Sequence, residues 1–236
     1  MIIAAVSDVH SPQYFSEYVR AIDWMKVKPD LFLIVGDMVH RGDLPEYQKV
    51  YNVLFGKITC PIVACFGNNE FQQLRDQLKL RYADIKFLDD ETVVLDIGGR
   101  SVGIIGTTGC LETATPWQKA NIPNIQQIFE SRIMFVEKYL QRLQVDFKIV
   151  LTHYAPTFKT LEGGNPRFFS TQGNQILEQV VVNNKANLVL HGHSHRGIKM
   201  AWADSVPIYN VAFPVNKEIV IIDTDKDLKP GISRFV

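Results

Sequence analysis

The sequence has little cysteine and no excess of either charge. Its three cysteines, Cys60, Cys65 and Cys110, are an odd number and lack the closely spaced pairs of a zinc ribbon, so we expect reduced thiols that pack in the core. The 25 basic residues balance the 25 acidic ones, and no block of like charge stands out. The chain therefore lacks the electrostatic footprint of a dedicated nucleic-acid-binding or membrane-binding protein.

Long hydrophobic runs are also absent. The opening stretch, MIIAAVSDVH, has no basic segment and reaches Asp8 too soon for a signal peptide or a membrane span. We therefore expect a cytoplasmic protein without a membrane anchor. With 46% hydrophobic residues and no internal repeat, the 236 residues can bury one large core, which predicts a single domain over residues 1–236.

Short apolar runs recur along the chain and share one design. Each is rich in Val, Ile and Leu and is continuous rather than alternating, as in strands buried on both faces. The runs are IIAAVS, LFLIVG, PIVACFG, KIVLT and NLVLHG, and helix-compatible segments over 12–26, 44–57 and 71–80 separate the early ones. This alternation predicts an α/β fold with a mostly parallel sheet. A long helix over 125–143 is also expected, and strands within 92–106 and 197–223 are candidates for a second sheet.

Each of these five runs leads into side chains that can bind a metal. They are Asp8 and His10, Asp37, Asn68, His153, and the pair His193 and His195. Because the carboxyl ends of parallel strands lie along one edge of a sheet, these side chains are expected to meet there. Where the backbone stays extended, residues two apart would point to the same side, about 7 Å from each other.

The chemistry of this set predicts two metal ions. Imidazole, carboxylate and amide oxygen without thiolate suit divalent Mn, Fe, Co, Ni or Zn. Seven ligands are too many for one tetrahedral ion, whereas two ions about 3.5 to 4 Å apart can share the central carboxylate of Asp37. Such a cationic centre can hold a hydroxide between the metals and bind an anionic phosphate. The predicted reaction is hydrolysis of a phosphate ester.

Five motifs carry a resemblance to a known family. They are Asp8-Val-His10, Gly36-Asp37-Met-Val-His-Arg41-Gly42, Gly67-Asn68-Asn69-Glu70, Thr152-His153 and Gly192-His193-Ser194-His195. In order and spacing they resemble the motifs of the calcineurin-like metallophosphoesterases. The resemblance implies two packed mixed β-sheets flanked by helices, a four-layer αββα sandwich. It also implies two sets of metal ligands, Asp8, His10, Asp37 and His195 for the first ion and Asp37, Asn68, His153 and His193 for the second.

Two positions near the implied centre depart from the family pattern. Arg41 matches an arginine that contacts phosphate in the phosphoprotein phosphatase branch, but His40 replaces the Asp that precedes it there. At Asn69 most members have a His that is credited with protonating the leaving group or stabilising the transition state, and that Glu70 would steady. An amide cannot be a general acid, and losing such a group typically costs a hundredfold to ten-thousandfold in rate.

Several alternatives stay open at this point. The first is a hydrolase for a small phosphate ester or a nucleotide-like substrate. The absence of His at position 69 motivates the second, a catalytically weak scaffold or binding protein, as in the retromer subunit that has this fold. A nuclease, as in the DNA-repair branch, is the third, although the neutral charge argues against it. His191 is expected to have a structural or orienting role, and His40 is either a surface loop residue or a substrate contact.

Overall fold

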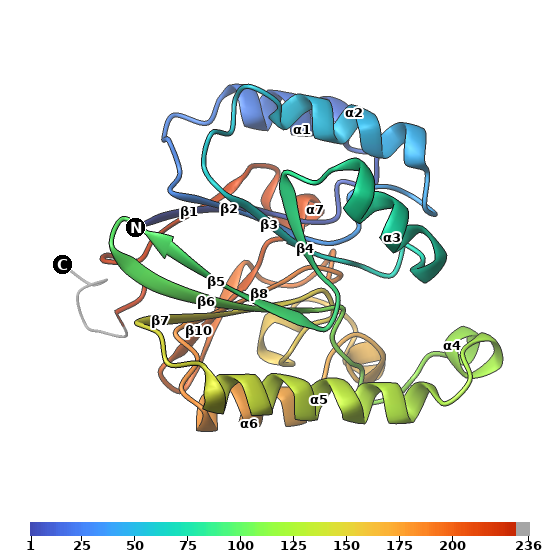
Figure 1. Cartoon of the computed structure of the whole chain (residues 1–236). Coiled ribbons are helices and arrows are strands. Elements are labelled where there is room, and N and C mark those ends of the chain that lie inside the picture. Colours follow the sequence, from blue (N-terminus) through green and yellow to red (C-terminus); the bar gives the residue numbers. More distant parts are fainter. Residues whose placement is uncertain (230–236) are drawn as a thin grey trace.

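The computed structural model describes residues 1–229 and contains two β-sheets packed between helices (Figure 1). The first sheet has the order β11-β1-β2-β3-β4. Its strands are β1 (Ile2–Val6), β2 (Leu31–Val35), β3 (Ile62–Cys65), β4 (Ile85–Leu88) and β11 (Val220–Asp223). Strands β1 to β4 are parallel, and β11 pairs antiparallel with β1.

The second sheet has the order β5-β6-β7-β8-β10-β9. Its strands are β5 (Glu91–Ile97), β6 (Arg100–Thr107), β7 (Phe147–Thr152), β8 (Leu188–His191), β9 (Met200–Ala203) and β10 (Val206–Asn210). The four central strands are parallel, whereas β5 and β9 run antiparallel at the two edges. Both sheets are therefore mixed.

Helices cover the outer faces of the two sheets (Figure 1). On the first sheet they are α1 (Phe15–Asp23), α2 (Leu44–Leu54) and α3 (Gln72–Arg81), and on the second α5 (Ile125–Arg142) and α6 (Gln175–Asn183). The remaining short elements are α4 (Pro116–Asn121), η1 (Lys159–Leu161), η2 (Pro166–Thr171) and α7 (Phe213–Asn216). No helix within residues 1–229 is long and apolar enough to cross a membrane.

Strand β2 shows why the apolar runs are continuous. Its LFLIV sequence is buried at every position. Leu31 and Leu33 belong to the core between the two sheets, whereas Phe32 and Ile34 belong to the core under the helices of the first sheet. Because side chains of a strand alternate between its faces, a strand buried on both sides needs an apolar residue at every position. The structure confirms the four-layer αββα architecture.

The distribution of the ligand-bearing strands differs from the expectation. The apolar runs predicted one sheet, but β1, β2 and β3 lie in the first sheet and β7 and β8 in the second. A strand buried on both faces has the same apolar pattern in either sheet, so the pattern does not show to which sheet a strand belongs. Strand β4 and helices α6 and α7 were not predicted. The α6 sequence QILEQVVVN contains three consecutive valines. Because valine has a low helix propensity, the sequence did not indicate a helix here.

A buried arginine on α3 connects the two sheets near their carboxyl edges. The Nη2 atom of Arg75 donates to the carbonyl of Gly67, after β3, at 3.3 Å and to Oγ1 of Thr108, after β6, at 3.1 Å. Its Nε donates to the carbonyl of Glu70 at 3.1 Å, and its Nη1 pairs with the carboxylate of Asp89. One guanidinium therefore holds loops from both sheets together.

The substitution Arg75→Leu is expected to lower the free energy of unfolding by about 3 kcal/mol, because it leaves the half-buried Asp89 without its partner and removes the link between the loops. Urea denaturation measures the change. The matched control is Arg81→Leu, at an exposed position of the same helix, where little change is expected. Equal stabilities of the two variants would contradict a joining role for Arg75.

Candidate metal centre

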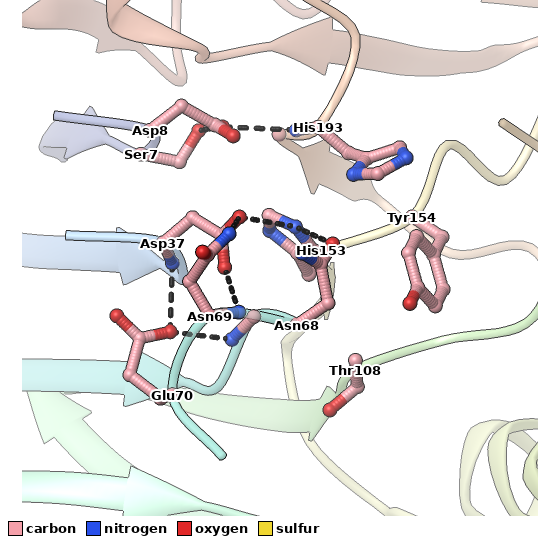
Figure 2. A network of polar contacts seen from close by, with 12 residues as sticks. Ser7, Asp8, Asp37, Asn68, Asn69, Glu70, Thr108, His153, Tyr154 and His193 are labelled. Carbon is pink, nitrogen blue, oxygen red and sulfur yellow. Dashed lines mark hydrogen bonds and ion pairs between the residues drawn. The ribbon is translucent and has the colours of Figure 1, made fainter. Parts of the chain in front are cut away.

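The predicted ligands lie together where the carboxyl ends of strands from both sheets face each other. Figure 2 shows five of them, namely Asp8, Asp37, Asn68, His153 and His193. Asp8, Asp37 and Asn68 follow β1, β2 and β3 of the first sheet. His153 follows β7 of the second sheet, and His193 and His195 follow β8. The proximity predicted for one sheet edge therefore arises at the junction of two sheets.

One group of donor atoms joins Asp8, His10 and His195. The Oδ1 atom of Asp8 lies 3.5 Å from Nε2 of His10 and 3.0 Å from Nε2 of His195. The two imidazole nitrogens are 3.3 Å apart. Ligands that bind one ion at about 2.0 to 2.2 Å stand about 3.0 to 3.5 Å from each other. The spacing of these three donors therefore fits a single divalent cation.

A second group forms around His153. Its Nε2 lies 3.2 Å from Oδ1 of Asn68 and 3.4 Å from Oδ2 of Asp37. Asp8 offers a further oxygen within 4.8 Å of the Asp37 and His153 donors. Its Nδ1 lies 3.0 Å from the carbonyl oxygen of Val35, which can only accept a hydrogen bond. Nδ1 therefore carries the hydrogen, and Nε2 is directed at the oxygen donors, as a metal ligand requires.

Both carboxylates lie between the two groups. Asp8 belongs to each of them. The Oδ2 atom of Asp37 stands 3.4 Å from Nε2 of His153 and 3.8 Å from Nε2 of His10. The sequence assigned the bridging position to Asp37 alone, whereas the geometry places Asp8 in a comparable position.

His193 is close to the centre, but its ring nitrogens belong to neither donor group. Its ring lies edge-on to the rings of His153 and Tyr154, with centroid separations of 5.2 and 4.8 Å. Its backbone N–H donates to Oδ2 of Asp8 at 2.9 Å. His193 thus supports Asp8 through its backbone, and ligation by its side chain stays a prediction.

The loops that carry these residues are not extended. Asp8, His10, Asp37 and His193 have φ angles of 56°, 44°, 52° and 64°. The extended backbone, on which the expected spacing of about 7 Å depended, is therefore not present at these residues. Left-handed conformations are uncommon for residues other than glycine and cluster at functional sites. Here they turn the chain sharply after each strand and direct the side chains into the junction.

Two glycines allow the carboxylates to lie against the backbone. A Cβ atom on Gly67 would come within 2.1 Å of Oδ1 of Asp37. One on Gly192 would come within 2.3 Å of Oδ2 of Asp8. Any side chain at either position would displace a carboxylate, which explains the glycine in both motifs.

The sequence did not indicate a role for Ser7, and it suggested only a general structural or orienting role for His191. The hydroxyl of Ser7 donates to Oδ2 of Asp8 at 2.6 Å, and nothing in the residue type marks this role. His191 is fully buried, with Nδ1 2.7 Å from the carbonyl oxygen of Gly192 and Nε2 2.8 Å from Oγ1 of Thr160. It joins the β8 end to the η1 segment, which agrees with the orienting role expected for it.

Glu70 has partners that the sequence did not indicate. Its carboxylate accepts hydrogen bonds from the backbone N–H groups of Asp37 (2.8 Å), Met38 (2.8 Å) and Gly67 (2.9 Å). Burial and the neighbouring Asp37 raise the pKa of Glu70, while these N–H groups oppose the shift. Instead of being left idle by the missing His, Glu70 ties the loop after β2 to the loop after β3.

Asn69 is hydrogen-bonded to Asp37 and links it to the backbone of Arg41. The Nδ2 and backbone N–H of Asn69 donate to Oδ2 and Oδ1 of Asp37 at 2.6 and 2.7 Å (Figure 2). The Oδ1 of Asn69 accepts from the backbone N–H of Arg41 at 3.0 Å, and the Arg41 side chain is exposed. Asn69 therefore orients a carboxylate and positions the Arg41 loop.

Proton equilibria at the centre follow from burial and from opposite charges. Burial opposes ionisation of Asp8, but hydrogen bonds from His10 and His195 bring its pKa well below the ordinary value. Burial alone would lower the pKa of His153, yet the adjacent Asp37 raises it to about 10. Burial lowers the pKa of His193 to about 3. In the apoprotein at neutral pH, His153 is thus protonated and His193 is neutral.

Metal binding is therefore expected to release about one proton from His153 at pH 7.5, because only neutral imidazole coordinates a metal. Its raised pKa means that protons compete below about pH 10, so metal affinity should rise with pH across this range. Calorimetric titration with Mn²⁺ in buffers of different ionisation enthalpy measures the release. Binding without proton release by the wild-type protein would contradict this protonation state.

The chain is similar to known proteins in sequence and in fold. A family model described as calcineurin-like phosphoesterase matches residues 1–197. Phosphopantetheinyl hydrolase (PptH) from Mycobacterium tuberculosis has a TM-score of 0.72 and 14% identity, with 97% of this chain and 98% of that chain covered. GAP50, the anchor in the inner membrane complex of Plasmodium, has a TM-score of 0.63 and 13% identity, with 91% and 72% covered.

A further solved structure shares the fold but is much longer. The putative 5'-nucleotidase from Staphylococcus aureus has a TM-score of 0.58 and 18% identity, with 89% of this chain and 48% of that chain covered. Identities this low show a common fold and nothing more. No curated protein sequence matched the chain.

The family match agrees with the five motifs, the αββα layers and the donor groups between the sheets. The expectation of a metal-dependent enzyme that acts on phosphate esters is confirmed at the level of the family, whose members use divalent metals. The chain belongs to the calcineurin-like phosphoesterase family.

Proposed function

We propose that the protein hydrolyses a phosphomonoester or phosphodiester of a small, nucleotide-like molecule with the help of two divalent cations. The observation that carries the proposal is the convergence of two donor groups, with donor separations from 3.0 to 3.5 Å within them. Neutral imidazoles and carboxylates at this spacing suit Mn, Fe, Co, Ni or Zn.

The proposed ligands form two sets that share Asp37. The first ion would be held by Asp8, His10, Asp37 and His195, and the second by Asp37, Asn68, His153 and His193. When bound, two such cations lower the pKa of a shared water and offset the negative charge of the phosphate.

The surrounding residues would keep the donors in place before substrate arrives. Val35 orients His153 through Nδ1, and Ser7 fixes one oxygen of Asp8. Asn69 holds both oxygens of Asp37. Side chains fixed in this way need little rearrangement during the reaction, which is a large part of electrostatic catalysis.

Arg41 would bind the phosphate. Its guanidinium is exposed, and its backbone is held next to Asp37 through Asn69. A guanidinium can donate two parallel hydrogen bonds to phosphate oxygens. The names of two fold neighbours, a phosphopantetheinyl hydrolase and a putative nucleotidase, support a small substrate. The zero net charge of the chain argues against a nucleic-acid substrate.

The alternative is a binding protein with weak or no catalysis. Two observations favour it, namely that Asn69 stands where the family has a His, and that one fold neighbour is named as an anchor. The complete donor set favours the enzyme, because buried carboxylates and imidazoles are costly to keep without a metal.

Replacing Asp37 by Asn tests the proposed centre. We expect Asp37→Asn to reduce hydrolysis of nitrophenyl phosphate and bis(nitrophenyl) phosphate to background, because both donor groups lose a charged oxygen. Steady-state turnover and the metal content of the purified protein are measured together. Asp76→Asn, at an exposed position of α3, is the matched control and should retain full activity. Unchanged turnover in Asp37→Asn would rule out a shared-carboxylate centre.

The wild-type protein separates the enzyme from its alternatives. After removal of bound metal, each of Mn²⁺, Fe²⁺, Co²⁺, Ni²⁺ and Zn²⁺ is restored and the two esters are assayed again. We expect turnover with at least one metal and none in the stripped protein. Background rates with every metal would favour the binding protein. Hydrolysis of DNA, with binding that weakens steeply as salt increases, would instead favour the nuclease.

A further inference from the structure

An exposed imidazole lies beside the metal centre without a role in it. The ring of His40 stands edge-on to the ring of His10, with centroids 6.3 Å apart. The side chain is exposed, and within residues 1–229 it has no hydrogen-bond or ion-pair partner. Its ring nitrogens are therefore free to contact a bound substrate.

The loop that carries His40 is nevertheless well fixed. The backbone N–H of His40 donates to the carbonyl of Ser11 at 3.2 Å, on the loop of Asp8 and His10. The next N–H, of Arg41, donates to Oδ1 of Asn69, which itself holds Asp37. His40 is thus anchored to both carboxylate loops, and its ring stands at the same rim as the proposed phosphate contact.

Three other polar side chains close to the centre are poorly placed to give a proton to a bound substrate. Glu70 accepts three backbone hydrogen bonds with its two oxygens. The hydroxyl of Tyr154 is buried and accepts from Nε2 of Gln118. Asn69 has an amide that cannot give up a proton at neutral pH. His40 differs from these three side chains because it combines exposure with an imidazole, which can transfer a proton.

We propose that His40 supplies the proton for the leaving-group oxygen, an inference that rests on the proposed hydrolysis. A water oxygen forms a bond to phosphorus and releases a proton to solvent, while the ester P–O bond breaks and its electron pair stays on the leaving oxygen. That oxygen takes a proton from the His40 ring, which regains one from solvent. In this chain the acid therefore comes from the loop after β2, whereas the position after β3 holds an amide.

The test compares leaving groups in the metal-loaded wild-type protein and in His40→Ala and His40→Asn. A nitrophenyl ester needs little protonation when it leaves, whereas an alkyl ester of the same phosphate class needs a proton donor. We expect kcat/KM for the alkyl ester to fall by about 10² to 10⁴-fold in both variants, with only a fewfold change for the nitrophenyl ester. Added imidazole should restore part of the alkyl-ester activity of His40→Ala.

The other possible outcomes of this experiment contradict the role of His40 or the proposed function. Equal losses on both esters, at unchanged metal content and circular dichroism, would show that His40 binds phosphate or supports the loop, and would overturn its role as an acid. Unchanged rates on both esters would overturn it as well. If the wild-type protein hydrolyses neither ester with any metal, the proposed function fails and the role of His40 fails with it. Wild-type turnover with an unaltered leaving-group preference in the variants overturns only the His40 proposal.

Discussion

Two buried carboxylates, Asp8 and Asp37, impose the constraint on which the surrounding structure depends. Their exposed fractions are 0% and 1%, and burying an ionised carboxylate costs several kcal/mol unless charges and hydrogen bonds compensate. Compensation comes from Ser7 and the His193 backbone for one, and from Asn69 for the other, with imidazoles facing both. Because these partners belong to strands of different sheets, neutralising the two charges also holds the sheets together at this edge.

Much of this arrangement could be predicted from the sequence. The rest depends on contacts between distant parts of the chain and on backbone groups, which leave no local pattern in the sequence. Continuous apolar runs mark doubly buried strands, so the ends that carry Asp37 and His153 were identifiable. Sheet membership is set by pairing with distant strands, and the same run fits either sheet. The left-handed backbone at Asp8 was not apparent because the residue is not glycine. Hydrogen bonds to Glu70 come from main-chain N–H groups, which every residue has.

Asn69 shows how a buried carboxylate can be held in place without an imidazole at position 69. The amide satisfies both oxygens of Asp37, so the carboxylate stays oriented although no imidazole follows it. Glu70 is equally independent of that imidazole, because it binds loop backbone. A protein named as a hydrolase, one named as a putative nucleotidase and one named as an anchor share these layers. The layers alone therefore do not determine what a member of this fold does.

The pairing of β11 with β1 has a consequence for how the chain folds. Ile2 lies opposite Asp223, so this edge of the first sheet forms only when two segments that are far apart in the sequence come together. The imidazoles of His153 and His195 are likewise distant in sequence from Asp8. Closing such long loops costs entropy before the contacts stabilise the fold. The two acidic loops therefore acquire their imidazole partners only through long-range packing of the two sheets.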